Sequence, residues 1–174
     1  MPATRHLFFA LDPPPPLRAA LAVHVARLRA EWGGRASAPA KLHMTLLFLD
    51  AVQDPLPAHV VDTARAVAET IRHPPIDITI DRADRFGKRI GWLGCSHVPD
   101  ALQHLHDTLA DTARAHDLPM RHEDRYAPHV TALRDPRTPV PHAIDPMPWH
   151  VDHFVLMASA EGAYEVLGSW PLRG

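Results

Sequence analysis

The stretch KLHMTLLFLD, residues 41–50, carries a histidine and a threonine two positions apart within an otherwise apolar run. Such a run predicts a β-strand, in which successive side chains point to opposite faces of the sheet. One face is expected to be pure core, and the other to carry the imidazole and the hydroxyl. The expected core face holds Met44, Leu46 and Phe48, and the polar face holds His43, Thr45 and Leu47. Polar groups placed there need partners, which are either other protein groups or a ligand.

The same pattern returns in APHVTALR, residues 127–134, where His129 and Thr131 share a strand face. A single His-x-Thr triplet is weak evidence in a chain with 14 histidines, because such a pair is usually satisfied within the protein. Both triplets lie inside apolar strands, however, and His129 follows His43 by 86 positions. The same shift places the helix expected near residue 17 onto the helix expected near residue 102. The second half of the chain is therefore predicted to repeat the organisation of the first.

Length and composition describe a globular protein. The chain has 174 residues, of which 46% are hydrophobic and 22% charged, which suits a single domain over residues 1–174 built of two similar lobes. Cys95 is the only cysteine, so an intramolecular disulfide and a cysteine-rich zinc site are excluded. The net charge of -2 does not suit coating of long nucleic acid, although contact with a few nucleotides remains open.

The N-terminal segment MPATRHLFFALD holds an apolar run too short for a signal peptide, and no run in the chain is long enough to span a membrane. We therefore expect a cytoplasmic protein with no membrane association. The expected oligomeric state is a monomer.

Hydrophobic periodicity predicts helices and strands that interleave along the chain. The expected strands cover residues 6–12, 41–50, 76–86, 89–95, 127–134, 149–160 and 163–172. The expected helices cover residues 17–32, 58–72 and 99–116. The proline-rich segment before residue 149 is expected to be a loop. The pattern predicts an α+β fold, in which the two His-x-Thr strands of a duplicated unit can lie side by side about a pseudo-two-fold axis and face one cleft.

Two imidazoles that face each other across a cleft suit a reaction that needs a proton acceptor and a proton donor near neutral pH. Hydrolysis of a phosphodiester is such a reaction, since one histidine can take a proton from water while the other gives a proton to the departing oxygen. Charge then builds on the oxygens of the phosphorus, and the hydroxyls of Thr45 and Thr131 are expected to stabilise it. His43 and His129 are the predicted catalytic pair, each contributing about a hundred- to ten-thousand-fold in rate.

The stretches HMTLLFL and PHVTALR, which follow RHLFFAL and precede the closing YEVLGSWPL, resemble the signature motifs of the 2H phosphoesterase superfamily. Within it, the chain is similar over essentially its whole length to the bacterial and archaeal RNA 2′,3′-cyclic phosphodiesterases, first described as 2′-5′ RNA ligases. The resemblance implies a bilobal fold, with an antiparallel sheet flanked by helices in each lobe. It implies an active site in the cleft between the lobes, with no metal and no cofactor. It also implies opening of a terminal RNA 2′,3′-cyclic phosphate to leave a 2′-phosphate.

By motif position, the resemblance implies catalytic roles for His43 and His129, and phosphate contacts from Thr45, Thr131 and Arg134. It suggests that His43 protonates the leaving 3′ oxygen while His129 activates water, an assignment that the residues themselves leave open. Strict alternation along the strand places Arg134 on the face opposite His129, so its contribution requires a bend at the strand end or an approach from the side.

Two positions depart from the usual pattern of the family. Asp50 stands where glycine is usual after the first motif, and Ala132 stands where leucine is usual after the second threonine. Neither residue carries the expected chemistry.

Two other classes of function stay open. The same site run backwards would join a 2′,3′-cyclic phosphate to a 5′-hydroxyl in a 2′-5′ linkage without ATP, and the excess of water favours hydrolysis. A non-catalytic nucleotide- or RNA-binding module is disfavoured because both histidines and both threonines are intact. The expected substrates are RNA ends or small nucleotides that carry a cyclic phosphate.

The remaining polar and aromatic residues have simpler explanations. Histidines two residues apart on a helix point to different faces, so no metal site is expected from His104, His106, His116 and His122. Phe86 and Trp92 are expected in the core, with stacking on a base as the alternative. HEDRY, residues 122–126, is expected to be a charged loop, with contact of Arg125 or Tyr126 with RNA as the alternative.

Overall fold

A computed structural model gives the fold and describes residues 4–121, 123 and 125–174. Its helices are α1 (Pro15–Trp32), α2 (Ala58–Thr70), α3 (Asp100–Ala115) and the short 3-10 helix η1 (Pro39–Lys41). The strands of the described residues are β1 (Thr4–Leu11), β2 (Arg35–Ala36), β3 (Met44–Gln53), β4 (Ile76–Phe86), β5 (Ile90–Gly94), β6 (Val130–Arg134), β7 (His142–Val151), β8 (His153–Ala160) and β9 (Ala163–Pro171). The predicted α+β class is confirmed. Within this part of the chain, none of the helices has the length and apolarity needed to cross a membrane.

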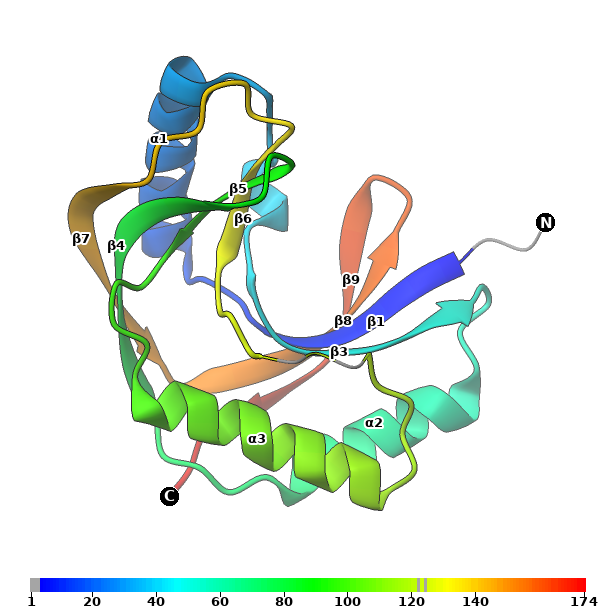
Figure 1. Cartoon of the computed structure of the whole chain (residues 1–174). Helices are drawn as coiled ribbons and strands as arrows, with labels where there is room; N and C mark the ends of the chain where they lie inside the picture. The colour runs from blue at the N-terminus through cyan, green and yellow to red at the C-terminus, as the bar shows by residue number, and fades with distance from the viewer. Residues whose placement is uncertain (1–3, 122, 124) are drawn as a thin grey trace.

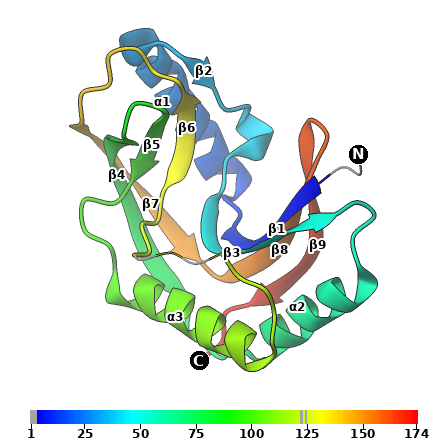
Figure 2. The same cartoon turned by 45° about the vertical axis from the view of Figure 1, so that its right-hand side comes forward.

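All the strands belong to one antiparallel sheet. Eight of them follow the order β7-β4-β5-β6-β3-β1-β8-β9, and the two-residue strand β2 pairs with β6. Figures 1 and 2 show the two halves of this path as separate arms, β7-β4-β5-β6 on one side and β3-β1-β8-β9 on the other.

The two arms meet through the two His-x-Thr strands. β3 and β6 run antiparallel and pair Met44 with Val130. These two residues are 86 positions apart, the same shift that relates the two motifs. An approximate two-fold axis between antiparallel strands places a residue opposite its own counterpart, as this pair is. The side-by-side arrangement predicted for the two strands is confirmed.

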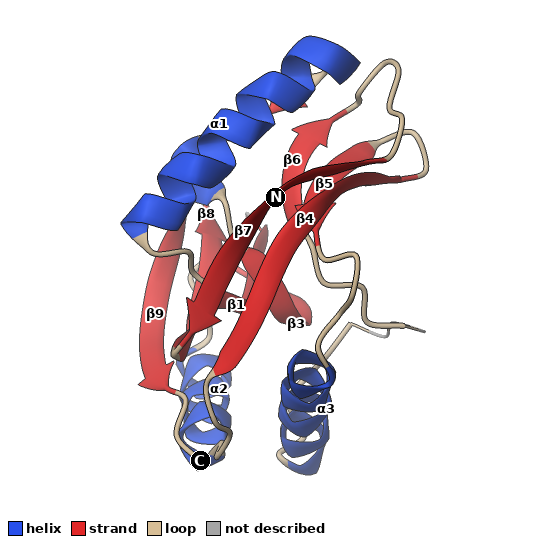
Figure 3. Ribbon diagram, turned by 90° about the vertical axis from the view of Figure 1, so that its left-hand side faces the viewer, coloured by secondary structure: helices blue, strands red, loops and turns tan. Residues whose placement is uncertain are grey.

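Each half of the chain supplies a helix to the other arm. α1 lies between β1 and β3 in the chain, yet it packs against β6 and β7. α3 lies between β5 and β6, yet it packs against β3, and α2 contacts both α3 and β9. Figure 3 shows α1 at one end of the molecule and α2 with α3 at the other. Because neither arm is covered by its own half alone, we infer that the chain folds as one domain of two lobes.

One continuous core runs through both arms. In α1 the buried residues Leu21, Val25 and Leu28 recur at helical spacing and end at Trp32, which is 3% exposed. The Trp32 ring covers Gly91 of β5, where a Cβ atom would lie 3.2 Å from two ring carbons. A smaller cluster on the other face of β1 and β8 holds Phe8, Ala10, Val155 and Met157. β1 is therefore buried on both of its faces.

The three predicted helices are confirmed to within two residues at each end. Prolines mark their starts, since α1 begins at Pro15 while α2 and α3 follow Pro57 and Pro99. Proline lacks the N–H group that the first turn of a helix leaves without a partner, so it is tolerated there. Gly33 ends α1 with a φ of 73°, a backbone conformation that favours glycine.

The loop predicted before residue 149 is confirmed over residues 135–141 and wrong from His142 on. That segment forms most of strand β7, which pairs with β4, and the run predicted as one strand over 149–160 is divided at Asp152. Pro146 and Pro148 lie within β7. β7 is at the edge of the sheet, and an edge strand tolerates proline because a missing N–H on its outer side removes no ladder hydrogen bond.

Replacing Trp32 by alanine should lower the free energy of unfolding of the whole chain by about 3–5 kcal/mol, because it leaves a cavity between α1 and β5. Far-UV circular dichroism and tryptophan fluorescence, followed in urea, should report one coincident transition for the wild type and the variant.

Val23, on the same helix and 50% exposed, provides the control. Val23→Ala should change the free energy of unfolding by less than about 0.5 kcal/mol. Two separate transitions in the wild-type protein would contradict the single-domain inference.

Candidate active site

Both motif strands carry one extra residue at the same place. In β3 the residue after Thr45 has no partner on β1, because the residues on either side of Leu46 pair with adjacent residues of β1. In β6, Ala132 is unpaired in the same way, since the residues that flank it pair with adjacent residues of β5. Such an insertion is a β-bulge, which bends the strand and re-aims the side chains beyond it. Leu46 and Ala132 are 86 positions apart, so the two bulges are counterparts.

The bulge in β3 changes which side chains face the cleft. Leu46 and Leu47 are consecutive, yet both are buried in the main core. Phe48 then lies on the same side as His43 and Thr45, where all three line a cavity. The predicted alternation is wrong beyond Thr45, because the pairing with β1 shifts by one residue there.

The bulge in β6 has the same effect on Arg134. Ala132 and Leu133 are both fully buried, and Arg134 returns to the side of His129 and Thr131. Strict alternation placed Arg134 on the opposite face. The bulge provides the bend that its approach to the site required.

The structure brings the five predicted site residues together. His43, Thr45, His129, Thr131 and Arg134 line one cavity of about 440 Å³. The rest of its wall comes from the segment between α1 and β3, from β3 and from β9, through Arg35, Ala36, Ser37, Ala38, Lys41, Phe48 and Tyr164.

The charges around this cavity are positive. Arg35, Lys41 and Arg134 line it, and no carboxylate does so among the residues that the structure describes. Arg35 is partly neutralised, because its guanidinium lies 2.9 Å from a carboxylate oxygen of Asp135. The cavity therefore suits an anion such as a phosphate group.

Each motif histidine lies one residue before its strand, and the same backbone contact fixes its ring. Nδ1 of His43 lies 2.8 Å from the carbonyl oxygen of Lys41, and Nδ1 of His129 lies 2.8 Å from that of Ala127. A carbonyl oxygen only accepts hydrogen bonds, so each Nδ1 donates and carries the proton of the neutral ring. Nε2 is therefore the basic nitrogen of both histidines and the one available to a ligand.

Aromatic rings surround the His43 imidazole. Phe8 stacks on it with ring centroids 5.1 Å apart, and Tyr164 meets it edge-on at 5.0 Å. Burial lowers the pKa of His43, the hydrogen bond to Lys41 opposes that shift, and the nearby His129 lowers the pKa further.

His129 has a similar environment. Phe86 meets its ring edge-on with centroids 4.7 Å apart, and Trp92 lies 6.2 Å away. Burial lowers the pKa of His129, while the hydrogen bond to Ala127 and the charge of Glu123 oppose the shift. The prediction that Phe86 and Trp92 belong to the core is wrong, because Phe86 is 38% exposed and Trp92 is half-buried outside both core clusters of the described residues.

A second cavity adjoins the first. It has a volume of about 210 Å³ and shares His43, Phe48, Arg134 and Tyr164 with the larger cavity. Its other lining residues are His6, Phe8, Arg121 and Ser159. The Arg121 guanidinium lies 4.7 Å from the centre of the Phe48 ring, so positive charge continues beyond the histidines.

Several other candidates from the sequence have structural roles. His106 contacts the carbonyl oxygen of Leu46, and the His104 ring lies at a tilt to that of His73, with centroids 5.2 Å apart. No three metal-binding side chains gather anywhere in the described ranges, and His122 lies outside them. In HEDRY, Asp124 is also outside the described residues, Arg125 is exposed, and Tyr126 donates its hydroxyl to the carbonyl oxygen of Thr45 at 2.9 Å.

Sequence reasoning missed the cavity residues outside the two motifs. Lys41 opens the first stretch and Arg35 precedes it, so a basic segment leading into a His-x-Thr strand is a signal that could have found both. Ser37 and Tyr164 have no such signal, because pairing of distant segments brings them to the site.

The two-armed antiparallel sheet and the pair of histidines in one cationic cavity are the features that define this class of protein. Comparison with known proteins identifies the family. A family model for the 2'-5' RNA ligase superfamily matches residues 13–163. The chain is 32% identical over 136 residues to the RNA 2',3'-cyclic phosphodiesterase of Escherichia coli (strain K12), a match that covers 78% of this chain and 74% of that protein. The chain belongs to the 2'-5' RNA ligase superfamily.

Solved structures agree with this assignment. E. coli LigT complexed with 3'-AMP superposes with a TM-score of 0.83 at 29% identity, over 99% of this chain and all of that one. E. coli LigT complexed with phosphate gives a TM-score of 0.75 at 30% identity, over 98% of this chain and 99% of that one.

The pKa values of His43 and His129 should both lie below about 6.5, the usual value for histidine, because burial disfavours the charged imidazolium in each case. NMR titration of the ring protons measures these pKa values, and His43→Asn and His129→Asn variants assign the resonances. In His129→Asn, the pKa of His43 should rise part of the way back, since one cause of its shift is removed. A pKa above 6.5 for either ring in the free protein would contradict this account.

Proposed function

We propose that this chain hydrolyses the 2′,3′-cyclic phosphate at the end of an RNA and leaves a 2′-phosphate. The observation that carries the proposal is the pair of half-buried imidazoles, His43 and His129, which share one cationic cavity and offer it the same ring nitrogen. One relative is named RNA 2',3'-cyclic phosphodiesterase, and E. coli LigT binds 3'-AMP and phosphate in its crystal structures. These relatives support a nucleotide phosphate as the ligand.

The proposed reaction has one proton donor and one proton acceptor. Nε2 of neutral His129 takes a proton from a water molecule, whose oxygen attacks the phosphorus. The bond between phosphorus and the 3′ oxygen breaks, and protonated His43 gives its Nε2 proton to that oxygen. The product is a 2′-phosphomonoester beside a free 3′-hydroxyl, with His43 neutral and His129 protonated. Exchange with solvent restores both rings.

The charge that develops on the phosphorus oxygens is the second requirement. The hydroxyls of Thr45 and Thr131 and the guanidinium of Arg134 line the same cavity as the histidines. Fixed donors aimed at developing charge stabilise a transition state more than the ground state. We assign phosphate contacts to these three side chains, and no step of the reaction requires a metal ion.

The lowered pKa values of the two imidazoles suit the two roles differently. A lowered pKa keeps His129 neutral and able to accept a proton. His43 must be protonated to act as the acid, and a bound phosphate anion raises the pKa of a nearby imidazole. The substrate thus promotes the protonated form of His43 that its own cleavage requires.

Ligation at the same site is the second candidate function. The adjoining cavity with Arg121 offers cationic space next to the phosphate position, where an RNA bearing a 5′-hydroxyl could lie. Its attack on the cyclic phosphate would form a 2′-5′ linkage without ATP. Water competes with that hydroxyl at far higher concentration, so hydrolysis dominates.

His43→Ala and His129→Ala should each lower kcat at least about a hundredfold, because each removes a proton carrier from the transition state. The assay uses a short RNA ending in a 2′,3′-cyclic phosphate in the presence of EDTA, and mass spectrometry with authentic standards identifies a 2′-phosphate rather than a 3′-phosphate. The wild-type kcat/KM should follow a bell-shaped pH profile with its maximum below about pH 6.5, since both free-enzyme pKa values are lowered.

A wild-type protein that binds the RNA but forms no product would support a non-catalytic binding module. Loss of activity in EDTA would overturn the metal-independent scheme.

Arg134→Ala should reduce kcat/KM for the same RNA by about ten- to a thousandfold, because it removes a charged donor from the phosphate site. Arg134→Lys should recover only part of the loss, since an ammonium group lacks the planar fork of guanidinium. Arg114→Ala removes an exposed arginine of α3 that pairs with Asp111, and it should leave kcat/KM unchanged. Equal kcat/KM values for wild type and Arg134→Ala would remove Arg134 from the site.

A further inference from the structure

The two bulges interrupt the regular pairing of β3 with β1 and of β6 with β5. An unpaired residue in a strand interrupts the ladder of backbone hydrogen bonds, so the carbonyl groups beside it need other donors. The carbonyls concerned belong to Thr45 and Leu46 in β3, and to Thr131 and Ala132 in β6. They lie directly behind the two threonine side chains assigned to the phosphate.

In β3, two side chains from elsewhere supply the donors. The Tyr126 hydroxyl donates to the carbonyl oxygen of Thr45 at 2.9 Å, and Nδ1 of His106 donates to that of Leu46 at 2.6 Å. The two rings stack in parallel, with centroids 4.1 Å apart and planes 1° apart. Burial raises the pKa of Tyr126, so its hydroxyl stays protonated and donates over the whole working range of pH.

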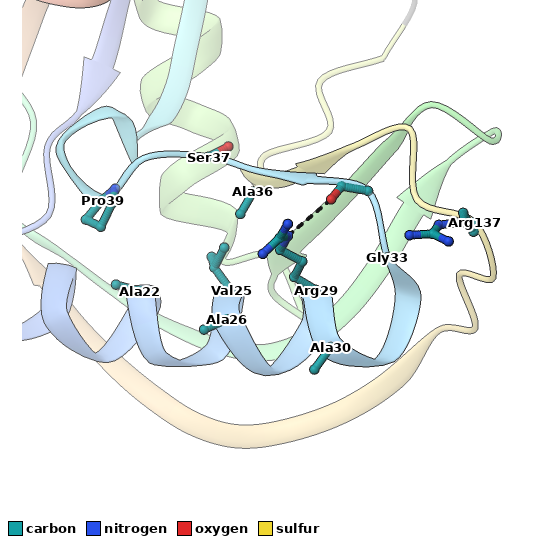
Figure 4. A pocket seen from close by; sticks show the side chains of 11 residues that line it. Ala22, Val25, Ala26, Arg29, Ala30, Gly33, Ala36, Ser37, Pro39 and Arg137 are labelled. Atoms are coloured by element: carbon teal, nitrogen blue, oxygen red, sulfur yellow. Dashed lines mark hydrogen bonds between the residues drawn. The ribbon is translucent and has the colours of Figure 1, made fainter.

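In β6, a single residue supplies both donors. The Ser37 hydroxyl donates to the carbonyl oxygen of Thr131 at 2.9 Å, and the backbone N–H of Ser37 donates to that of Ala132 at 2.8 Å. Ser37 lies between β2 and η1, on the segment that faces α1 across another cavity of about 420 Å³ (Figure 4). The segment is tied to β6 by the pairing of Arg35 with Arg134 and of Ala36 with Leu133.

The carbonyls at one bulge correspond in position to those at the other, but the groups that donate to them are of different kinds and come from different parts of the chain. One set is an aromatic pair from α3 and the segment before β6, and the other is a serine from the segment before β3. The shared element is the geometry of the bulge, which decides where Phe48 and Arg134 point, while the carbonyls of Thr45 and Thr131 belong to the backbone that carries the two threonine hydroxyls.

We propose that Ser37 and the stacked pair of Tyr126 and His106 are positioning residues, which hold the two bulges in the form that aims the phosphate-binding side chains into the cavity. Their role in catalysis rests on the function proposed above. Their support of the two bulges does not depend on it. Misplacement of catalytic groups by about 1 Å can cost about a hundredfold in rate. Losing one of these donors therefore lowers kcat without removing any of the side chains assigned to the phosphate or to proton transfer.

Ser37→Ala and Tyr126→Phe each delete one hydroxyl and keep the rest of the side chain. Each should lower kcat for the cyclic-phosphate RNA about ten- to a hundredfold, with KM changed less than about threefold. Ser37→Thr keeps the hydroxyl and should restore most of kcat. The control is Thr63→Val, which deletes a hydroxyl that donates to a helix carbonyl, that of His59, at 2.7 Å. It should leave kcat and KM unchanged.

A second readout does not depend on activity. Hydrogen–deuterium exchange should rise over residues 130–134 in Ser37→Ala and over residues 44–48 in Tyr126→Phe, while each variant keeps the other motif strand protected. Binding of inorganic phosphate, measured by NMR titration, should weaken in both variants.

The outcomes separate the two proposals. A wild-type protein that hydrolyses nothing, with exchange and phosphate binding altered as stated, overturns the proposed function and supports the positioning role. Unchanged exchange and phosphate binding, with kcat within twofold of wild type, overturns the positioning role. A fall in thermal stability with normal kcat for the folded fraction also overturns it. If Tyr126→Phe fails to fold, the comparison of Ser37→Ala with Ser37→Thr decides.

Discussion

The bulge that follows each motif threonine is the constraint on which the rest of the site depends. A regular strand would place Phe48 and Arg134 on the core side, where a guanidinium has no partner. One unpaired residue, Leu46 in β3 and Ala132 in β6, reverses the alternation and delivers both side chains to the cleft. The same shift lets two consecutive apolar residues remain in the core. The same β-bulge, present in both β3 and β6, therefore places side chains in the cleft and keeps the apolar residues in the core.

The two motif strands are related by an approximate two-fold axis and have similar backbones, but not all of the side chains that they present to the cavity are the same. The counterparts His43 and His129 have the same tautomer, each fixed by a carbonyl two residues earlier. Beyond the bulges the counterparts differ, because an aromatic ring in β3 corresponds to a guanidinium in β6. Symmetric placement of the two imidazoles with unequal neighbouring residues suits the reaction proposed above, in which one oxygen of the substrate leaves while water enters opposite it.

The sequence predicted the histidine and threonine pairs because residue type and spacing are visible in the letters themselves. It could not predict the bulges, since Leu46 and Ala132 are ordinary apolar residues whose effect depends on pairing with β1 and β5. The hydrogen bonds of Ser37 and Tyr126 could not be predicted for a related reason, because the carbonyls to which they donate are 94 and 81 positions away in the sequence. Strand β7 was missed because proline usually indicates a loop, and its place at the edge of the sheet emerges only from the topology.

The exchange of helices between the arms has a consequence for synthesis of the chain. Translation completes α1 long before the strands that cover its apolar stripe, β6 and β7, leave the ribosome. Among the described residues of the nascent first half, only the short segments β2 and η1 pack against α1, so part of its hydrophobic face stays exposed and is prone to aggregation or chaperone binding. A chain truncated within its last third would keep its first His-x-Thr motif and still lack strands against which its first helix packs.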